Sequence, residues 1–481
     1  MSNIAEFGGV LGGKTPSKAN PGFWRNGTVP WVSPKDMKVF DLDGAEDAIA
    51  EQAISGAGMS VLPSNSILMV TRSGILAHSF PVAITSVPVT INQDIKAIRP
   101  RSEIFLPRYL AYNLRAHGPL ILDACSKAGT TVASVESKAL ERVPLPLAPL
   151  PEQARIADKL DTVLARVDAC RDRLDHVGAA LKRFHKAVLA AATSGRLTED
   201  WRTGRGAARR SGDAHSIPED GSFDDVAKVT TELPEAWRWG RLAIGITEAS
   251  YGTATKSSKA GAMPVLRMGN LQGGRIDWSD LAYSNDDGDN QKYMLAVGDI
   301  LFNRTNSPEL VGKTAIYLGE RPAIYAGYLI RVKCNENILN PKYVNFCLNA
   351  PYGRAYCWAV KSDGVSQSNI NAEKLRSFPV PYCEVEEQEE IVRRVEILLS
   401  FADRLEARLA QANAAADRLT PALLAKAFRG ELVPQDPNDE PASELLKRLN
   451  DDRLRAVKGT KSPRSQRIPA SSERDYENTA V

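Results

Sequence analysis

Two stretches of the chain, Ile156–Val188 and Ile391–Leu423, carry apolar residues at alternating spacings of four and three. Each apolar position of the second stretch lies 235 residues after its counterpart in the first. At a hydrophobic content of 43%, about nine of these twenty positions would be apolar by chance, whereas all of them are. A heptad pattern kept over this length predicts two long coiled-coil helices.

These apolar positions define the seam through which each helix is expected to pack. Smaller side chains, Cys170, Val177, Ala402, Ala412 and Ala416, occupy seam positions between the larger ones. The predicted seam residues are Ile156, Leu160, Val163, Val167, Leu174 and Leu181 in the first helix, and Ile391, Val395, Leu398, Leu405, Leu409 and Leu419 in the second.

The repeat continues on both sides of the helices. Val143–Pro146 precedes the first helix, and Phe378–Pro381 precedes the second at the same offset. Both helices open on Glu-Gln, and both are followed by a glycine, Gly195 or Gly430, which is a common stop signal. The unit that is repeated is therefore a globular domain followed by a long helix.

The length of 481 residues fits two domains of about 150 residues plus helices. The apolar segment Ile67–Val70 matches Ile300–Asn303, so both domains are expected to contain strands. We predict a mixed α/β (α+β) fold in which two similar globular domains are separated by two long helices. The predicted boundaries are 1–150 for the first domain, 151–197 for the first helix, 198–231 for a linker, 232–383 for the second domain, 384–432 for the second helix and 433–481 for a C-terminal segment.

Helices of equal length and matched repeat favour pairing within the chain. An antiparallel pair leaves the linker little distance to cover, whereas a parallel pair would force it back along the whole helix. Antiparallel pairing gives a pseudo-twofold repeat with two similar domains at a fixed separation. Such a molecule suits a target with two sites at fixed separation; double-stranded DNA and two protein partners both satisfy this condition.

Composition is that of an ordinary globular protein, with 25% charged residues and six cysteines that form no C-x-x-C pair. Neither a zinc site nor a disulfide framework is therefore expected. The chain has no apolar run of about 20 residues and no signal peptide, which predicts a cytoplasmic protein without membrane contact.

Charge adds little for the chain as a whole, because the net charge is +3. The segment Arg453–Arg467 holds six basic residues and no acidic ones, and with its Ser and Pro it is typical of a disordered tail. A solvated tail is the simpler interpretation, and non-specific contact with DNA is the alternative.

The sequence offers no convincing catalytic motif. Asn349-Ala350-Pro351-Tyr352 lacks the first proline of a methyltransferase tetrapeptide and is typical of a helix end. Asp123 with Glu136-Ser137-Lys138 fits a metal-nuclease pattern only loosely, and the chain has no G-x-x-x-x-G-K-[ST] loop. We therefore expect a protein without a catalytic or metal site of its own.

Several tracts resemble the specificity subunits of type I restriction–modification systems. They are Gly12–Ser17, Pro30–Ser33, Val143–Gln153, Leu233–Leu242 and Ala427–Asp436, and the resemblance covers the chain up to about Leu449, including its duplication. One departure concerns the first half. The segment Leu233–Trp237 leads into the second domain, and no similar segment precedes Phe7 in the first. A shortened N-terminus would explain this departure, and so would an edge supplied by the stretch after Gly430.

The resemblance implies different roles for the globular domains and for the long helices. Each globular part would be a target-recognition domain that reads one half of a split DNA sequence, and the helices would set the gap. The helices would also dock two modification subunits that methylate adenine at N6, and restriction (motor-nuclease) subunits would join for cleavage. The chain would need no cofactor, since S-adenosylmethionine, ATP and Mg are expected on the partner subunits.

DNA contacts require side chains that donate or accept at base edges or phosphates, and polar loops provide them. Trp24 is the weakest candidate, since packing under its loop is the simpler role. The predicted DNA-binding residues are Lys14, Ser17, Lys18, Trp24, Arg25 and Arg72 in the first domain, and Lys256, Lys259, Arg267, Asn270, Arg304, Asn306, Lys313, Gln367 and Asn369 in the second.

Two functions from other classes remain open on the residues alone. A specificity-like interaction scaffold would grip proteins and read no DNA; its complexes would depend less on salt than DNA binding does. A fused nuclease would cut DNA by itself in the presence of metal.

Overall fold

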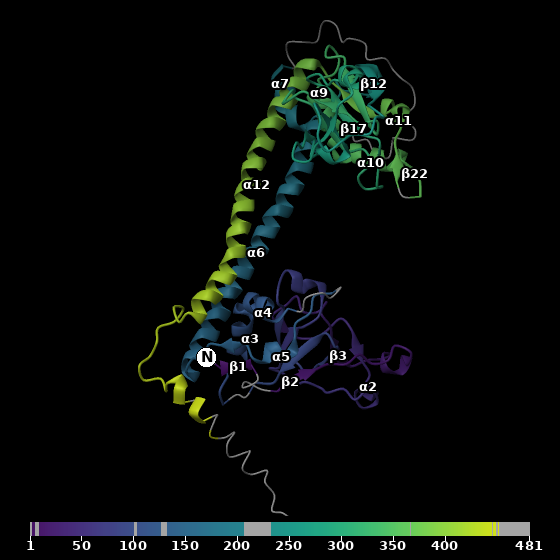
Figure 1. The fold of residues 1–481 in the computed structure, drawn as a ribbon. Helices are drawn as coiled ribbons and strands as arrows, with labels where there is room; N and C mark the ends of the chain where they lie inside the picture. The colour runs from purple at the N-terminus through teal and green to yellow at the C-terminus, as the bar shows by residue number, and fades with distance from the viewer. Residues whose placement is uncertain are drawn as a thin grey trace, which may run out of the picture. The chain divides into compact units, whose positions relative to one another are not determined.

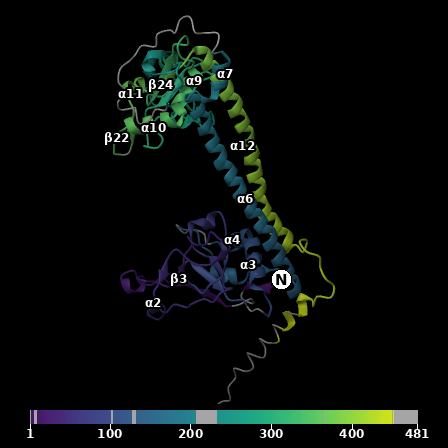
Figure 2. The same cartoon turned by 180° about the vertical axis from the view of Figure 1, so that it is seen from behind.

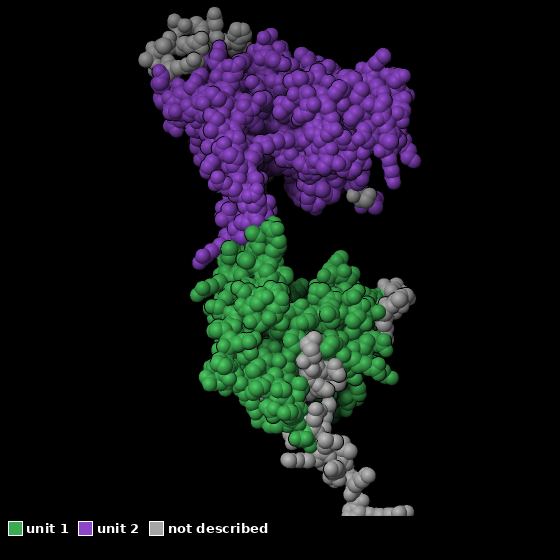
Figure 3. Space-filling view, turned by 60° about the vertical axis from the view of Figure 1, so that its left-hand side comes forward, with its two compact units in different colours: residues 1–172, 413–481 green, residues 173–412 purple. Residues whose placement is uncertain are grey.

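The structure is a computed structural model that describes residues 2–4, 9–100, 103–126, 132–205, 232–365, 367–444, 446–448 and 451. The chain forms two compact units (Figure 3). Unit 1 comprises residues 1–172 and 413–481, and unit 2 comprises residues 173–412. Most of the predicted linker, from residue 206 to 231, and the basic tail lie outside the described residues.

Unit 1 is built on a five-stranded sheet with strand order β2-β9-β6-β7-β4. Its central strand β6 is the apolar segment Ile67–Val70, in which all four residues are buried. A smaller sheet has the order β5-β3-β8, with β3 antiparallel to β5 and parallel to β8. The strands are β2 (Val10–Gly12), β3 (Val29–Val32), β4 (Asp41–Leu42), β5 (Ala48–Ile49), β7 (Val82–Thr85), β8 (Thr90–Ile91) and β9 (Ile95–Ile98).

Helices cover the larger sheet of unit 1 and join it to the long helices. Tyr109, Leu110 and Leu114 of helix α3 are fully buried, and they share one core with β6, β7 and β9. The shorter elements are η1 (Pro21–Phe23), α2 (Glu51–Gly56), η2 (Gly74–Ala77), α3 (Pro107–Ala116), α4 (Gly118–Cys125), α5 (Ser137–Glu141) and the strand pair β1 (Ser2–Asn3) and β10 (Pro144–Leu145).

Unit 2 repeats this topology, with four strands in its larger sheet where unit 1 has five. Its larger sheet has the order β12-β21-β17-β19, and its smaller sheet β16-β13-β20 again joins one antiparallel and one parallel neighbour to the middle strand. The strands are β11 (Arg238–Arg241), β12 (Ile246–Tyr251), β13 (Met263–Leu266), β14 (Leu271–Gln272), β15 (Arg275–Ile276), β16 (Ala282–Ser284), β17 (Ile300–Asn303), β18 (Thr305–Asn306), β19 (Thr314–Ile316), β20 (Ile324–Tyr325), β21 (Leu329–Cys334), β22 (Ser362–Asp363), β23 (Ser368–Asn369) and β24 (Pro379–Tyr382).

Helices α9, α10 and α11 of unit 2 follow its larger sheet in the same order as α3, α4 and α5 follow that of unit 1. The bounds of the unit 2 helices are η3 (Arg196–Thr198), α7 (Glu199–Arg205), η4 (Leu242–Gly245), η5 (Met268–Asn270), α8 (Asp287–Lys292), α9 (Pro341–Asn349), α10 (Pro351–Val360) and α11 (Ala372–Arg376). The interpretation of Asn349–Tyr352 as a helix end is confirmed, because α9 ends at Asn349 and α10 begins at Pro351. The predicted internal repeat is thus present in both sheets and in the helices that follow them.

The two long helices are α6 (Leu150–Thr193) and α12 (Val385–Phe428), each of 44 residues. Both end just before the predicted glycines, and Gly195 and Gly430 adopt left-handed φ values of 76° and 77°. In unit 1, Arg171 of α6 donates to the carbonyl oxygen of Ala416 at 3.1 Å. Within each unit the helices run side by side (Figures 1 and 2), and the predicted antiparallel pairing is confirmed.

The seam is only partly the predicted one. Ile156, Leu160, Val167, Leu181, Ile391 and Val395 are buried, and Val163, Leu174, Leu398, Leu405 and Leu409 are half-buried. The prediction is wrong for Cys170, which is exposed, and for Val177 and Leu419, which are 45% and 46% exposed. Thr420, Leu424 and Ala427 take the inner positions after Ala416. A straight helix drifts about 20° per heptad, so a strict heptad leaves the interface after a few turns.

The first half does have an entry strand. Ser2 and Asn3 pair with Leu145 and Pro144 in β10, as β11 pairs with β24 in unit 2. The stretch after Gly430 also packs within unit 1, where Leu432 and Val433 contact the core. The expectation that the first half lacks such an edge is therefore wrong, because β1 provides it. Among the helices that the structure describes, none is long and apolar enough to cross a membrane.

Candidate nucleic-acid interface

In unit 2 the segment that follows the central strand β17 pairs with the segment that precedes α11. The amide of Ile370 donates to the carbonyl oxygen of Arg304 at 2.9 Å, and β18 pairs with β23. We call this pairing the junction of unit 2. It brings together four of the predicted DNA-binding residues from two distant parts of the sequence: Arg304, Asn306, Gln367 and Asn369.

The same junction is present in unit 1. The amide of Val135 donates to the carbonyl oxygen of Thr71 at 2.8 Å, and Arg72 forms an antiparallel bridge with Ser134. Thr71 is therefore the counterpart of Arg304, and Arg72 is the counterpart of Thr305. Arg72 remains exposed at this junction.

Arg304 presents an unneutralised cation at the junction of unit 2. Its guanidinium lies over the ring of Tyr251, 4.7 Å from the centroid, and Tyr251 is 41% exposed. Among the described residues, Arg304 forms no ion pair, and its buried Nε has no hydrogen-bond partner. A guanidinium stacked on an exposed aromatic ring, with donors to spare, suits a phosphate or a base edge.

A second cation–aromatic pair lies at the C-terminal end of α10. Trp358 of α10 is 58% exposed, and the Lys361 ammonium lies 4.5 Å from its ring centroid. Tyr251 and Trp358 are not among the residues predicted from the sequence, because neither is a cation or an amide in a polar loop. The charge of Lys361 is compensated by Asp363 at 2.6 Å.

The N-terminal candidates of unit 1 lie along one loop. Lys14, Ser17, Lys18 and Arg25 are exposed there. Trp24 packs edge-on against Trp31 at 5.2 Å between centroids, and its Nε1 donates to the carbonyl oxygen of Ser17 at 3.2 Å. Trp24 thus supports the loop that carries the cations, which is the simpler role expected for it.

Three predicted DNA-binding residues of unit 2 make hydrogen bonds or ion pairs within the protein. Asn270 is 2% exposed; its Oδ1 accepts from the amide of Arg267, and its Nδ2 donates to the carbonyl oxygens of Asp277 and Asp280. The prediction that Asn270 reads a base is wrong, because its amide shapes the turn. Arg267 pairs with Asp280 at 2.9 Å. Lys313 donates to Gln272 at 3.1 Å. Lys256 and Lys259 are exposed on the loop after β12.

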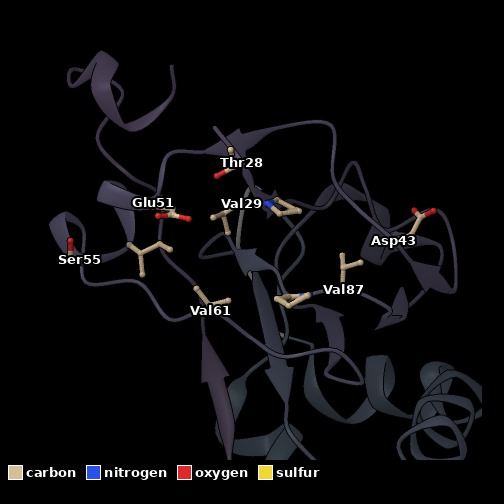
Figure 4. A pocket seen from close by; sticks show the side chains of 10 residues that line it. Thr28, Val29, Asp43, Glu51, Ser55, Val61 and Val87 are labelled. Atoms are coloured by element: carbon tan, nitrogen blue, oxygen red, sulfur yellow. The ribbon is translucent and has the colours of Figure 1, made fainter. Parts of the chain in front are cut away.

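An open depression of about 780 Å³ lies on unit 1 beside its smaller sheet (Figure 4). Its lining is apolar apart from small polar groups and the carboxylates of Asp43 and Glu51. No lysine or arginine lines it, so phosphate binding is not favoured there.

One cluster among the described residues has metal-ligand chemistry: His185, Asp403 and Glu406 on the long helices of unit 2. The carboxylate of Asp403 already forms an ion pair with Arg275 at 2.8 Å. The Nδ1 atom of His185 contacts the carbonyl oxygen of Leu181 at 3.0 Å. We assign no metal to this cluster.

Comparison with known proteins identifies the family. The profile of the type I restriction modification DNA specificity domain matches residues 1–177 and 246–413, one match in each half. The chain belongs to this family, and it is a DNA specificity subunit of a type I restriction–modification system.

The relatives agree over most of the chain. The EcoKI specificity subunit of Escherichia coli strain K12 is 31% identical over 352 residues, which is 70% of each chain. The EcoR124I/EcoR124II specificity subunit of Escherichia coli is 42% identical over 158 residues, 33% of this chain and 39% of the relative. A solved chain from work on complex assembly and conformational transition of the type I R-M system has a TM-score of 0.63 at 18% identity, over 89% of this chain and 97% of that one.

Proposed function

We propose that the chain reads a bipartite DNA target, with one half-site for each unit, and positions adenine N6-methyltransferase subunits over the two halves. In this proposal the chain performs no catalysis. S-adenosylmethionine, ATP and Mg bind to the partner subunits, two modification subunits join for methylation, and restriction subunits join for cleavage.

The observation that carries the proposal is the junction that occurs once in each unit. The backbone pairing is the same, but the side chains differ: Thr71 and Arg72 stand in unit 1 where Arg304 and Thr305 stand in unit 2. Sequence is read by side chains at base edges while backbone geometry positions them. Two equivalent junctions with different side chains therefore fit two half-sites of different sequence.

The long helices support the partner part of the proposal. The helices are antiparallel in each unit, so each unit presents the start of one long helix beside the end of the other. Two such equivalent surfaces suit two copies of one partner in a pseudo-twofold arrangement. The modification subunit is the partner that this arrangement fits.

The test is co-expression of this chain with the modification subunit from its own locus in a host without DNA methylation. Single-molecule sequencing then maps N6-methyladenine. The expected result is a split motif with a fixed unread gap, methylated on both strands.

Other results would contradict parts of the proposal. Methylation of one undivided motif would show that a single unit reads DNA. A stable complex that methylates nothing would favour the interaction scaffold, and cutting by the isolated chain with metal would show a catalytic site.

A further inference from the structure

We propose that unit 1 carries a binding site for a tryptophan-bearing segment of a partner protein. This site, here called the indole site, is formed by Glu152 at the start of α6 and by Leu423 and Val433 at and beyond the end of α12. The carboxylate of Glu152 accepts the indole N–H of the partner's tryptophan. The inference concerns a contact with protein rather than DNA, and it does not depend on the proposed function.

In unit 2 the equivalent site is filled by the chain itself. Glu387, at the start of α12, is 3% exposed and accepts hydrogen bonds from Trp237 Nε1 at 2.9 Å and from Thr198 Oγ1 at 2.7 Å. Arg202 also donates to Glu387, and its guanidinium lies 5.5 Å from the centroid of the Trp237 ring. Trp237 is 2% exposed. A buried carboxylate of unit 2 is thus compensated by three donors, one of which is an indole.

Glu152 is the counterpart of Glu387 in unit 1. The two residues lie 235 positions apart, and the glutamines that follow them, Gln153 and Gln388, make equivalent hydrogen bonds. Glu152 is 7% exposed, so its burial is kept. Among the described residues, however, none donates a hydrogen bond to the Glu152 carboxylate or forms an ion pair with it. A buried carboxylate without a donor is costly, and a ligand that supplies one relieves the cost.

The charges around Glu152 favour a ligand that donates hydrogen bonds. Burial raises the pKa of the Glu152 carboxyl; nearby Arg155 opposes this effect, and Asp439 adds to it. Arg155 is itself engaged, because it pairs with Asp439 at 2.6 Å. Two carboxylates therefore share one guanidinium, which leaves an excess of negative charge at the site.

The end of α12 gives a second, independent sign of an unfilled site. In unit 2, Pro234 of the segment that leads into β11 packs against Gly195, where a Cβ atom would lie 2.5 Å from Pro234 Cγ. Gly430 is the counterpart of Gly195, and the atom nearest to a Cβ there is Nε2 of Gln435, at 3.2 Å. In the described part of unit 1, nothing takes the place of Pro234 at this glycine.

The other residues of the indole site are apolar. Val188, which shares one core with Trp237 in unit 2, is 5% exposed, whereas its counterpart Leu423 is half-buried. The counterpart of the donor Thr198 is Val433, which is also half-buried and has no hydroxyl. Leu423 and Val433 both border the core of unit 1. An indole bound here would cover apolar surface and find its polar partner in Glu152.

Tryptophan suits this site better than a lysine or a serine. Its ring buries a large apolar surface, and its single polar atom is a donor that needs an acceptor when buried. Strand β1 lies beside the first turns of α6 in unit 1 (Figure 1), and Ile4 shares a core with Ile156. A segment of about five residues, the length of Leu233–Trp237, could therefore approach Glu152 next to β1 as that segment approaches Glu387 next to β11.

The experiment uses the full chain and a peptide probe with the sequence of Leu233–Trp237, with fluorescein at its N-terminus and an amide at its C-terminus. A second peptide carries phenylalanine in place of tryptophan, which removes the N–H and keeps an aromatic ring. The variants are Glu152→Gln and, as a matched control, Asp158→Asn, an exposed carboxylate of the same helix. Fluorescence anisotropy measures binding, and thermal unfolding without peptide measures the stability of each variant.

The wild-type chain should bind the tryptophan peptide saturably, at one site per chain and about tenfold more tightly than the phenylalanine peptide, which cannot donate to the carboxylate. Glu152→Gln should weaken binding of the tryptophan peptide at least about fivefold, because a neutral acceptor replaces a charged one. Asp158→Asn should bind like the wild type. Glu152→Gln should not lower the unfolding temperature, because the carboxylate has no donor to lose in the free chain.

The proposal is overturned if the wild type does not bind the tryptophan peptide, or binds the two peptides equally. Equal binding of the tryptophan peptide by the wild type and Glu152→Gln would also overturn it, since the peptide would then lie elsewhere, for instance at Glu387. A large loss of stability in Glu152→Gln would show that the chain itself already fills the site, as it does in unit 2.

Discussion

Gln153 and Gln388 hold the first turns of α6 and α12 with the same three hydrogen bonds. Gln153 Oε1 accepts from the amide of Leu106 at 3.0 Å, and its Nε2 donates to the carbonyl oxygens of Ile104 and Ala148, both at 2.9 Å. Gln388 makes the equivalent bonds to Asn340, Ile338 and Cys383 at 2.8, 3.0 and 3.0 Å. Both side chains are fully buried. Each glutamine therefore ties a long helix to the loop before α3 or α9.

Replacing Gln388 by Ala should destabilise unit 2 by about 3 kcal/mol, because it leaves three buried backbone groups without partners. Gln411→Ala, on an exposed position of the same helix, should change stability by less than about 0.5 kcal/mol. Urea denaturation of the two variants checks this. Equal midpoints for both would show that water replaces the lost bonds.

A second prediction concerns Glu387, the residue before Gln388. Glu387 is 3% exposed and accepts from Trp237 Nε1 at 2.9 Å, from Thr198 Oγ1 at 2.7 Å and from Arg202. Glu387→Ala should cost about 3 kcal/mol, because Arg202 would stay half-buried with its charge uncompensated. Glu386→Ala, on the exposed neighbour, should be nearly neutral. Thermal unfolding measures both, and a neutral Glu387→Ala would contradict the role of this network.

The sequence predicted the parts of the fold that depend on local pattern. The duplication, the two long helices and their ends at Gly195 and Gly430 follow from periodicity and from the left-handed preference of glycine. The antiparallel direction followed from chain connectivity alone. These features need no knowledge of long-range packing.

The site was predictable only in part, for a physical reason. The junction joins Arg304 to Ile370 across the whole of α9 and α10, and pairings between strands so distant leave no periodic signal. Whether a polar residue faces DNA depends on partners that only the fold supplies. The amide of Asn270 is hydrogen-bonded within its own turn, whereas Arg304 forms no ion pair among the described residues. Arg304 and Asn270 looked alike as polar residues near strand ends.

The third prediction concerns Glu248 of β12, which forms an ion pair with the nearly buried Arg331 of β21 at 2.6 Å. Burial alone would raise the pKa of this carboxyl, but hydrogen bonds from Ser250 and Arg331 lower it to about 2. The ordinary value is about 4.3, so the carboxylate stabilises unit 2 above that pH, and this contribution is lost as the pH falls toward 2.

Glu248→Gln should therefore unfold at a temperature that depends less on pH between about 4.3 and 2 than the wild type does. Thermal scans in this range test the prediction. Glu309→Gln, an exposed carboxylate of the same unit, is the control and should keep the wild-type slope. Parallel curves for wild type and Glu248→Gln would mean that the pair with Arg331 does not form.

The fourth prediction tests the seam at the end of α12. Leu424 is 4% exposed, whereas Leu419 is 46% exposed although the heptad includes it. Leu424→Ala should cost about 3 kcal/mol by leaving a cavity in the core of unit 1, and Leu419→Ala should cost less than about 1 kcal/mol. Chemical denaturation distinguishes them. A larger loss at Leu419 would restore the strict heptad seam.

The last prediction compares two arginines of unit 2 that the sequence could not tell apart. Arg304 stacks on Tyr251 without an ion pair among the described residues, while Arg267 is held by Asp280 at 2.9 Å. A free guanidinium that meets a phosphate releases a counterion, and each such contact adds about 0.9 to the slope of log affinity against log salt. Arg304→Ala in the full complex should therefore weaken target binding at least about fivefold and lower that slope by about one. Arg267→Ala should change the slope by less than half as much, because its charge is already compensated within the protein. Fluorescence anisotropy across a salt series measures both slopes, and equal slopes for the two variants would show that ion pairing inside unit 2 does not decide which arginine meets DNA.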